Sequence, residues 1–158
     1  MPTATTDTSN RELAISRLLH APRELVWEAW TNPEHVKNWW GPNGFTNTIH
    51  EMEVKPGGVW LLTMHGPDGR DYPNKIIFLE VVKPERLVYR HSDEEGTEGV
   101  SFHTTVTFEK QGNKTLLTMK GVFDTAAELE RVIREYGAKE GMDQTVSRLA
   151  DYLTNLNP

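Results

Sequence analysis

The order of apolar and polar residues divides the chain into a strand, two short helices, a series of strands and a helical end. Residues 12–19 alternate as a strand does, with Leu13 and Ile15 on the same side. Apolar positions in residues 23–30 recur at helical spacing after Pro22, a residue that suits a helix start. Pro33 ends this helix and begins a second short one, which we expect to include Trp39 and Trp40.

Residues 46–123 show the pattern of antiparallel strands joined by short turns. The apolar segments alternate with polar positions and are separated by residues typical of turns: Pro56-Gly57-Gly58, Pro67-Asp68-Gly69, Lys83-Pro84-Glu85 and Gly112-Asn113. The acidic, glycine-containing segment 92–99 is expected to be a solvated loop. These features predict about six strands after the first.

The C-terminal region is helical, with one interruption. Thr125 and Glu128 have the spacing of a capping box, which marks a helix start. The apolar stripe then loses its helical phase near Gly137. We therefore expect a short helix, a break, and a long amphipathic helix over about residues 138–154.

This order predicts an α+β fold in which a curved antiparallel sheet of about seven strands wraps on a long C-terminal helix. Residues 11–156 are expected to form one domain, and residues 1–10 a disordered lead-in. A curved sheet cannot press evenly on a straight helix. We therefore expect a mostly apolar cavity between them, of the order of ~300–1,000 Å³.

Composition excludes several classes of function. The net charge of −6 and the lack of a basic cluster argue against nucleic acid as a partner. No apolar run approaches the ~20 residues of a membrane span, and the N-terminus has no signal-peptide pattern, so we expect a cytoplasmic protein without membrane insertion. With no cysteine and no close histidine pair among the 6 histidines, no metal site is expected. No phosphate-binding, dinucleotide-binding or nucleophile-elbow motif is present, so we predict no cofactor and assign no catalytic residue.

Two ionisable residues fall on inward faces of predicted strands. His91 shares a face with Tyr89, where either a structural or a catalytic role is open. Alternation places Glu80 with Phe78, which predicts a semi-buried carboxylate. A structural ion pair with an arginine of the next strand, or an exposed edge position, is the alternative.

Aromatic and methionine side chains make up most of the predicted inward surface. Such a set is usually core, but part of it can form the adaptable wall of a binding cavity. The residues expected at the wall or rim of the cavity are Trp40, Trp60, Met64, Phe78, Glu80, Tyr89, His91, Phe102, Thr104, Met119, Met142, Val146 and Leu149. Of the adjacent tryptophans, we expect Trp40 at the rim and Trp39 in the core.

Four stretches together resemble one protein family: NPEHVKNWWGP, EMEVKPGGVWLLTM, HGPDGRDYPNKIIFLEVVKPERLVYRH and EGMDQTVSRLADYL. They are similar to the family named for the C-terminal domain of the activator of the heat-shock chaperone ATPase. That family belongs to the START-like (SRPBCC) superfamily, which has the helix-grip fold. The resemblance runs from about Leu13 to Leu153 and implies this fold. Because the superfamily hosts many functions, it does not by itself imply one.

Three functions are compatible with these features. The leading hypothesis is a domain that holds a small apolar or amphipathic molecule between sheet and helix, without covalent catalysis. The second is an enzyme of the cyclase or lyase kind that uses the same cavity, with Glu80, His91, Tyr89 or Thr104 transferring protons. The third is a regulator of a chaperone ATPase. It is the least favoured, because the chaperone activator has an additional N-terminal domain and only about ten residues precede the first strand here. A homodimer is compatible with all three.

Overall fold

The computed structural model describes residues 11–91 and 102–156. The expected lead-in at residues 1–10 and the expected acidic loop at residues 92–99 lie outside the described residues. The elements, in chain order, are β1 (Glu12–Leu19), α1 (Arg23–Thr31), α2 (Pro33–Val36), β2 (Thr46–Met52), β3 (Val59–His65), β4 (Asp71–Val82), β5 (Arg86–His91), β6 (Phe102–Gln111), β7 (Lys114–Phe123), α3 (Ala126–Tyr136) and α4 (Ala138–Leu156).

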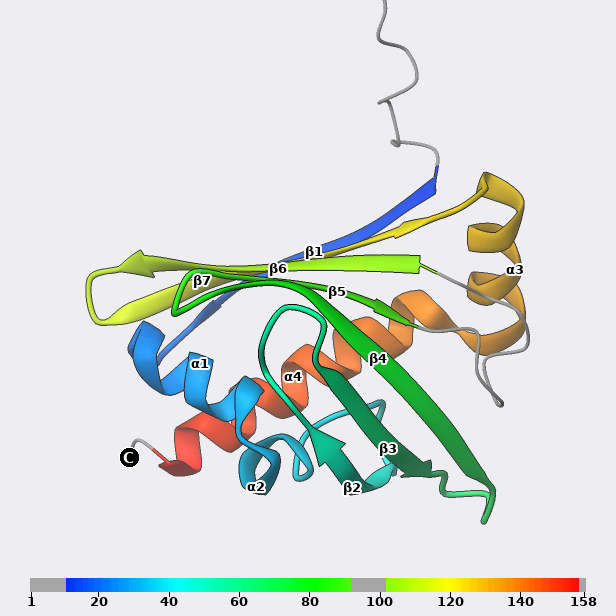
Figure 1. Ribbon diagram of the computed structural model, residues 1–158, viewed down its shortest axis with the longest axis horizontal. Helices are drawn as coiled ribbons and strands as arrows, with labels where there is room; N and C mark the ends of the chain where they lie inside the picture. Colours follow the sequence, from blue (N-terminus) through cyan, green and yellow to red (C-terminus); the bar gives the residue numbers. More distant parts are fainter. Residues whose placement is uncertain (1–10, 92–101, 157–158) are drawn as a thin grey trace, which may run out of the picture.

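The strands listed above belong to one antiparallel sheet with the order β1-β7-β6-β5-β4-β3-β2. Strands β2 to β7 form a meander, and β1 pairs with β7 at the other end. Figure 1 shows α4 running along one face of the sheet, with α1 and α2 at one end and α3 at the other. This is the helix-grip arrangement, and the predicted fold class is confirmed.

The helix boundaries follow local signals in the sequence. The Thr125 side chain accepts a hydrogen bond from the Glu128 backbone N–H, which caps α3. Gly137 adopts a left-handed φ of 61° and separates α3 from α4, as predicted. Helix α2 is shorter than expected and ends at Val36, so Trp39 and Trp40 lie in the turn that follows it. Among the described residues, no helix combines the length and the apolar character that crossing a membrane requires.

The core lies between the sheet and α4 and extends to α1. All five tryptophans are buried there. The ring centroids of Trp30 and Trp39 are 4.8 Å apart, and those of Trp40 and Trp60 are also 4.8 Å apart. From α4, Val146, Leu149 and Leu153 complete this cluster.

A β-bulge in β4 overturns the inward placement predicted for Glu80. The register between β4 and β5 shifts between Phe78 and Glu80. Phe78 is fully buried, but beyond the shift the alternation changes phase, so that Val81 packs against the core and Glu80 is exposed. The Glu80 carboxylate accepts a hydrogen bond from Arg86 Nε at 2.8 Å, which is the alternative ion pair.

Candidate functional site

A line of aromatic side chains crosses the inner face of the sheet; we call it the inner strip. It comprises Trp60 on β3, Phe78 on β4, Tyr89 and His91 on β5, and Phe102 on β6. Consecutive ring centroids are 6.2, 6.2, 6.1 and 4.4 Å apart. The antiparallel register sets this order, because it places Phe78 opposite Tyr89 and His91 opposite Phe102.

The inner strip contains polar atoms that are shielded from water but not hydrogen-bonded. Trp60 Nε1, the Tyr89 hydroxyl and His91 Nδ1 are buried and have no hydrogen-bond partner among the residues that the structure describes. Buried polar groups in proteins are nearly always paired. Each unpaired one costs about 1–3 kcal/mol. Four further atoms of this kind, among them Trp30 Nε1 and Asn47 Oδ1, lie elsewhere among the described residues, but these three lie together on one strip, where a bound molecule would supply the missing partners.

Burial keeps both ionisable groups of the strip uncharged. It raises the pKa of the Tyr89 phenol, a shift that the Thr104 hydroxyl opposes in part. Thr104 is the cross-strand neighbour of Tyr89, yet it does not satisfy the Tyr89 hydroxyl with good geometry. Burial lowers the pKa of the His91 imidazole to about 4. At neutral pH the strip therefore presents a phenol and a neutral imidazole.

The interior around the strip is apolar. Within the described ranges, the buried polar residues are three threonines, Thr104, Thr115 and Thr145, and no charged residue is buried. Arg17 points from β1 toward α4, where its Nη1 donates to Ser147 Oγ at 2.7 Å. The site thus offers hydrogen bonds without a buried charge.

A slot between β1 and the first turns of α4 borders the same core. It has a volume of about 310 Å³ and is lined by Leu13, Ala14, Ile15, Lys139, Glu140, Met142 and Asp143. Ile15 and Met142 also pack against the buried cluster that contains Trp60, Phe78 and Tyr89. Of the predicted wall residues only Met142 lines the slot, whose volume is at the lower end of those usual for small-molecule sites.

The structure brings most of the predicted wall residues together. One buried cluster contains Trp40, Trp60, Phe78, Tyr89, Met119, Val146 and Leu149, with Met64 and Met142 packed against it. Thr104 is buried beside Tyr89, and Phe102 packs against a smaller cluster that includes Phe123. Glu80 lies apart, on the outer surface. Sequence reasoning missed the contribution of Leu13 and Ile15 to the slot, although their shared face was visible in the alternation.

Both adjacent tryptophans are buried, and they have different surroundings. Trp39 Nε1 donates to the Ala29 carbonyl oxygen at 3.0 Å and is fully enclosed. Trp40 is 6% exposed and lies against Trp60, at one end of the inner strip. The pair therefore joins α1 to the sheet.

Arg148 of α4 holds the segment that follows the tryptophans; we call this arrangement the arginine clamp. Its guanidinium donates to the carbonyl oxygens of Asn38, Trp40, Gly41, Pro42 and Phe45 at 2.9–3.4 Å. Desolvation lowers its pKa. Glycine is favoured at position 41 because its φ is +93°, a conformation that residues with a Cβ rarely adopt. Sequence reasoning missed this arginine, because no local pattern marks it.

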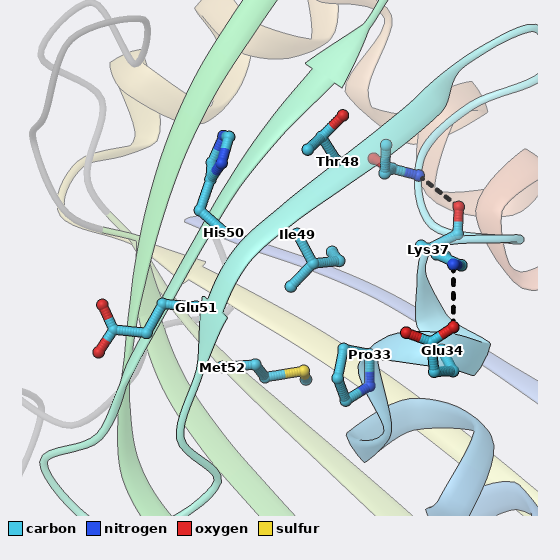
Figure 2. A pocket seen from close by; sticks show the side chains of 9 residues that line it. Pro33, Glu34, Lys37, Thr48, Ile49, His50, Glu51 and Met52 are labelled. Atoms are coloured by element: carbon cyan, nitrogen blue, oxygen red, sulfur yellow. Dashed lines mark hydrogen bonds and ion pairs between the residues drawn. The ribbon is translucent and has the colours of Figure 1, made fainter.

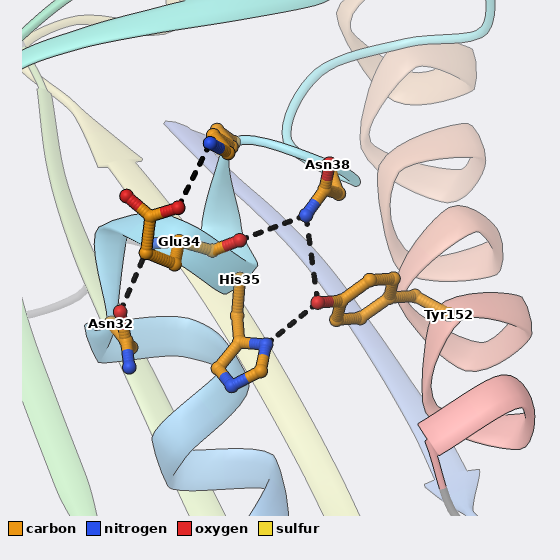
Figure 3. Close-up of polar contacts among 6 residues, drawn as sticks. Asn32, Glu34, His35, Asn38 and Tyr152 are labelled. Atoms are coloured by element: carbon orange, nitrogen blue, oxygen red, sulfur yellow. Dashed lines mark hydrogen bonds and ion pairs between the residues drawn. The ribbon is translucent and has the colours of Figure 1, made fainter.

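A second contact joins α2 to α4 beside the clamp (Figure 3). The Tyr152 hydroxyl is hydrogen-bonded to His35 Nδ1 at 2.6 Å, and Asn38 Nδ2 approaches it at 3.5 Å. Asn38 also donates to the Glu34 carbonyl oxygen at 2.8 Å. The polar groups at this junction are thus paired within the protein.

A groove of about 470 Å³ lies between α2 and the edge strand β2 (Figure 2). Ile49 and Met52 point toward Pro33 of α2, and an ion pair of 3.0 Å between Lys37 and Glu34 lies at its rim. β2 is an edge strand, which explains why this side of the strand is open. The rim and most of the lining are solvent-exposed, so a ligand here would gain less from burial than one at the inner strip.

A carboxylate–imidazole–hydroxyl chain lies on the sheet across β2, β3 and β4. His65 Nδ1 is 2.7 Å from Asp71 Oδ1, and its Nε2 is 2.8 Å from Thr48 Oγ1. The His65 and Asp71 side chains are 38% and 65% exposed. Solvent screening at these exposures argues for a surface contact that ties β2 to β4 rather than for an activated nucleophile. In the part of the chain that the structure describes, no group of histidine and acidic residues could hold a metal ion.

Comparisons with solved structures agree with this fold. A solution structure of a protein from Arthrobacter aurescens is 26% identical, with a TM-score of 0.86 over 95% of this chain and 90% of that one. A crystal structure of a protein from Nitrosomonas europaea is 24% identical, with a TM-score of 0.80 over 93% of this chain and 96% of that one. DynU16, described as a putative protein in the dynemicin biosynthetic locus, is 21% identical, with a TM-score of 0.67 over 91% of this chain and 47% of that one.

The comparison with curated proteins found no match. The sequence model described as Activator of Hsp90 ATPase homolog 1-like protein matches residues 20–154, a range that includes the tryptophan pair, the inner strip and the clamp arginine. The chain therefore belongs to the Activator of Hsp90 ATPase homolog 1-like family, as its sequence motifs suggested.

Proposed function

We propose that this protein binds a small hydrophobic or amphipathic molecule between the inner face of its sheet and α4, without forming a covalent bond to it. The observation that carries the proposal is the set of unpaired polar atoms on an otherwise apolar strip, Trp60 Nε1, the Tyr89 hydroxyl and His91 Nδ1. A ligand that supplies hydrogen bonds there removes the cost of burying these groups unpaired. The helix-grip fold, which forms a groove between sheet and helix, supports the same reading.

The second interpretation, a cyclase or lyase, is less well supported by the same residues. A general base works best with a pKa near the working pH. Burial lowers the pKa of His91 to about 4, which makes its imidazole a weak base at neutral pH. Burial shifts the pKa of Tyr89 upward, away from neutrality, so its phenol is a hydrogen-bond donor and a poor proton-transfer group. These environments favour binding over proton transfer.

The third interpretation, a regulator of a chaperone ATPase, requires an exposed interaction patch. Among the described residues, the exposed large hydrophobic side chains are Leu18, Leu79, Val82, Ile133 and Leu156. These side chains are spread over four elements, β1, β4, α3 and α4. The unpaired polar atoms of the inner strip, in contrast, come from two strands. The family name alone therefore gives this function less support than the strip gives ligand binding.

The proposal is tested on the protein as isolated and with added ligands. Native mass spectrometry is expected to detect a co-purified small molecule, or thermal denaturation is expected to show stabilisation by uncharged amphiphiles. A ligand at 100 times its dissociation constant adds about 2.7 kcal/mol to the free energy of unfolding. If no bound molecule is found and no amphiphile raises the melting temperature, the proposal fails.

Blocking the slot tests the route of entry. Met142→Trp places an indole in the slot between β1 and α4 and is expected to weaken binding at least about tenfold. Leu156→Trp adds the same side chain at the exposed end of the same helix and serves as the control. Equal binding by both variants would mean that the ligand enters elsewhere.

A further inference from the structure

The unpaired atoms of the inner strip differ in the hydrogen bonds that they can form. The Trp60 indole N–H is a hydrogen-bond donor only, whereas the Tyr89 hydroxyl donates and accepts. Phe78 lies between these two rings, 6.2 Å from each by centroid. A molecule that lies along the strip therefore meets a donor on either side of one phenyl ring. An oxygen acceptor on the ligand satisfies either donor.

The inner strip itself contains no counter-ion for a charged ligand. No charged residue is buried within the described ranges. Glu80 is turned outward onto Arg86 by the bulge, and the Arg148 guanidinium is occupied by backbone carbonyls. Arg17 donates to Ser147 at the side of α4.

The remaining charged groups near the site lie at the mouth of the slot. Lys139, Glu140 and Asp143 line it, so both signs of charge are present there. A carboxylate that moved from this mouth to the strip would lose its hydration and gain no ion pair. A carbonyl or hydroxyl group would lose much less, because the donors of the strip replace its hydrogen bonds with water.

From these two observations we infer that the ligand is uncharged where it meets the inner strip and carries an acceptor oxygen there, as a ketone, ester or alcohol does. Free fatty acids and other amphiphiles with an ionised head are excluded from that end. This inference rests on the proposed function and adds the chemical class of the ligand to it.

The experiment compares compounds of equal chain length at neutral pH: octane, 2-octanone, 1-octanol and octanoate. Binding is measured by tryptophan fluorescence and by thermal shift on the full chain. 2-Octanone and 1-octanol are expected to bind about fivefold more tightly than octane, since one hydrogen bond is worth about that factor. Octanoate is expected to bind at least about tenfold more weakly than 2-octanone.

Variants assign the preference to the strip. Tyr89→Phe removes the buried hydroxyl and is expected to reduce the advantage of 2-octanone over octane about fivefold, with octane binding unchanged. Tyr72→Phe is the matched control, because the Tyr72 hydroxyl donates to Asp68 near the turn between β3 and β4. It is expected to leave every affinity unchanged.

Each outcome separates the inference from the proposed function. If none of the four compounds binds, the proposed function fails together with the inference. If octanoate binds as tightly as 2-octanone, or more tightly, the neutral-ligand inference is overturned and ligand binding stands. If the preference for 2-octanone persists unchanged in Tyr89→Phe, the assignment of the acceptor oxygen to the Tyr89 hydroxyl is overturned.

Discussion

The arginine clamp and the inner strip contain similar polar groups and use them in opposite ways. At the clamp and the adjoining α2–α4 contact, Arg148 donates to a series of backbone carbonyls, and the Tyr152 hydroxyl is bonded to His35. On the inner strip, Tyr89 and Trp60 keep a hydroxyl and an indole N–H without a partner among the described residues.

This difference in hydrogen bonding indicates different roles for the two regions: the clamp fixes elements to each other, and the inner strip is available for binding. A polar group whose hydrogen bonds are made within the protein fixes two elements to each other, here α4 to the segment after α2. A buried polar group without a partner lowers stability, and a bound molecule that pairs with it removes that cost. Stability measurements on matched variants can therefore test whether the two regions really differ.

The largest expected effect comes from removing the clamp. Arg148→Met keeps the aliphatic length but removes the donors to the carbonyls of residues 38–45, and should lower the free energy of unfolding by about 3–4 kcal/mol. Urea denaturation measures this loss. Arg148→Lys should recover only part of it, since one ammonium cannot reach all the carbonyls. A loss below about 1 kcal/mol would show that the clamp is not a stabilising contact.

The next effect concerns the pH dependence caused by His91. Burial lowers its pKa from 6.5 to about 4 in the folded protein, so the unfolded chain binds the proton more tightly. The contribution of His91 to stability is complete above pH 6.5 and is lost as the pH falls toward 4. At about 1.4 kcal/mol per pKa unit, the loss is roughly 3 kcal/mol.

Urea denaturation at a series of pH values measures this dependence. His91→Phe, which keeps a ring against Phe102, is expected to flatten the stability profile between pH 6.5 and 4. His50→Phe is the control, since His50 is exposed on β2. An unchanged slope in His91→Phe would mean that the imidazole is not shielded as the structure indicates.

The sequence predicted the elements well where a local signal determines them. The spacing of Thr125 and Glu128 predicted the cap of α3, and Gly137 predicted the break before α4; the structure confirms both. Strand alternation also predicted that Tyr89 and Thr104 face inward, and both are buried.

The sequence could not predict features that depend on a partner far along the chain. The bulge that exposes Glu80 lies in the pairing between β4 and β5. Because the prediction assumed strict alternation along β4, it did not include the change of phase at the bulge. The carboxylate at helical spacing from Arg148, Asp151, suggests an ion pair on the helix surface and gives no sign of the carbonyl groups that Arg148 contacts. Its acceptors lie 103 or more residues away, and only the packing of α4 brings them to it.

Removing one tyrosine hydroxyl in each region is expected to change the free energy of unfolding by no more than about 1 kcal/mol, and to destabilise the protein only at the α2–α4 contact beside the clamp. Tyr152→Phe removes a paired hydroxyl and should destabilise the protein by about 1 kcal/mol. Tyr89→Phe removes an unpaired buried hydroxyl and should leave the ligand-free protein equally stable or up to about 1 kcal/mol more stable. Urea denaturation of the ligand-free protein compares the two variants. Destabilisation of similar size in both variants would abolish the distinction between the regions.

The smallest effect is expected at Glu80, which lies outside both regions. Its carboxylate and the Arg86 side chain are 48% and 43% exposed, and an ion pair this accessible to water contributes at most about 0.5 kcal/mol. Glu80→Gln should therefore change the midpoint of urea denaturation only slightly and leave the affinity for 2-octanone unchanged. Had Glu80 pointed inward, as strict alternation predicted, the same substitution would remove a semi-buried charge and strengthen the binding of octanoate. A change in octanoate affinity in Glu80→Gln would thus indicate that Glu80 belongs to the binding site, and it would contradict the outward position that the bulge gives this residue.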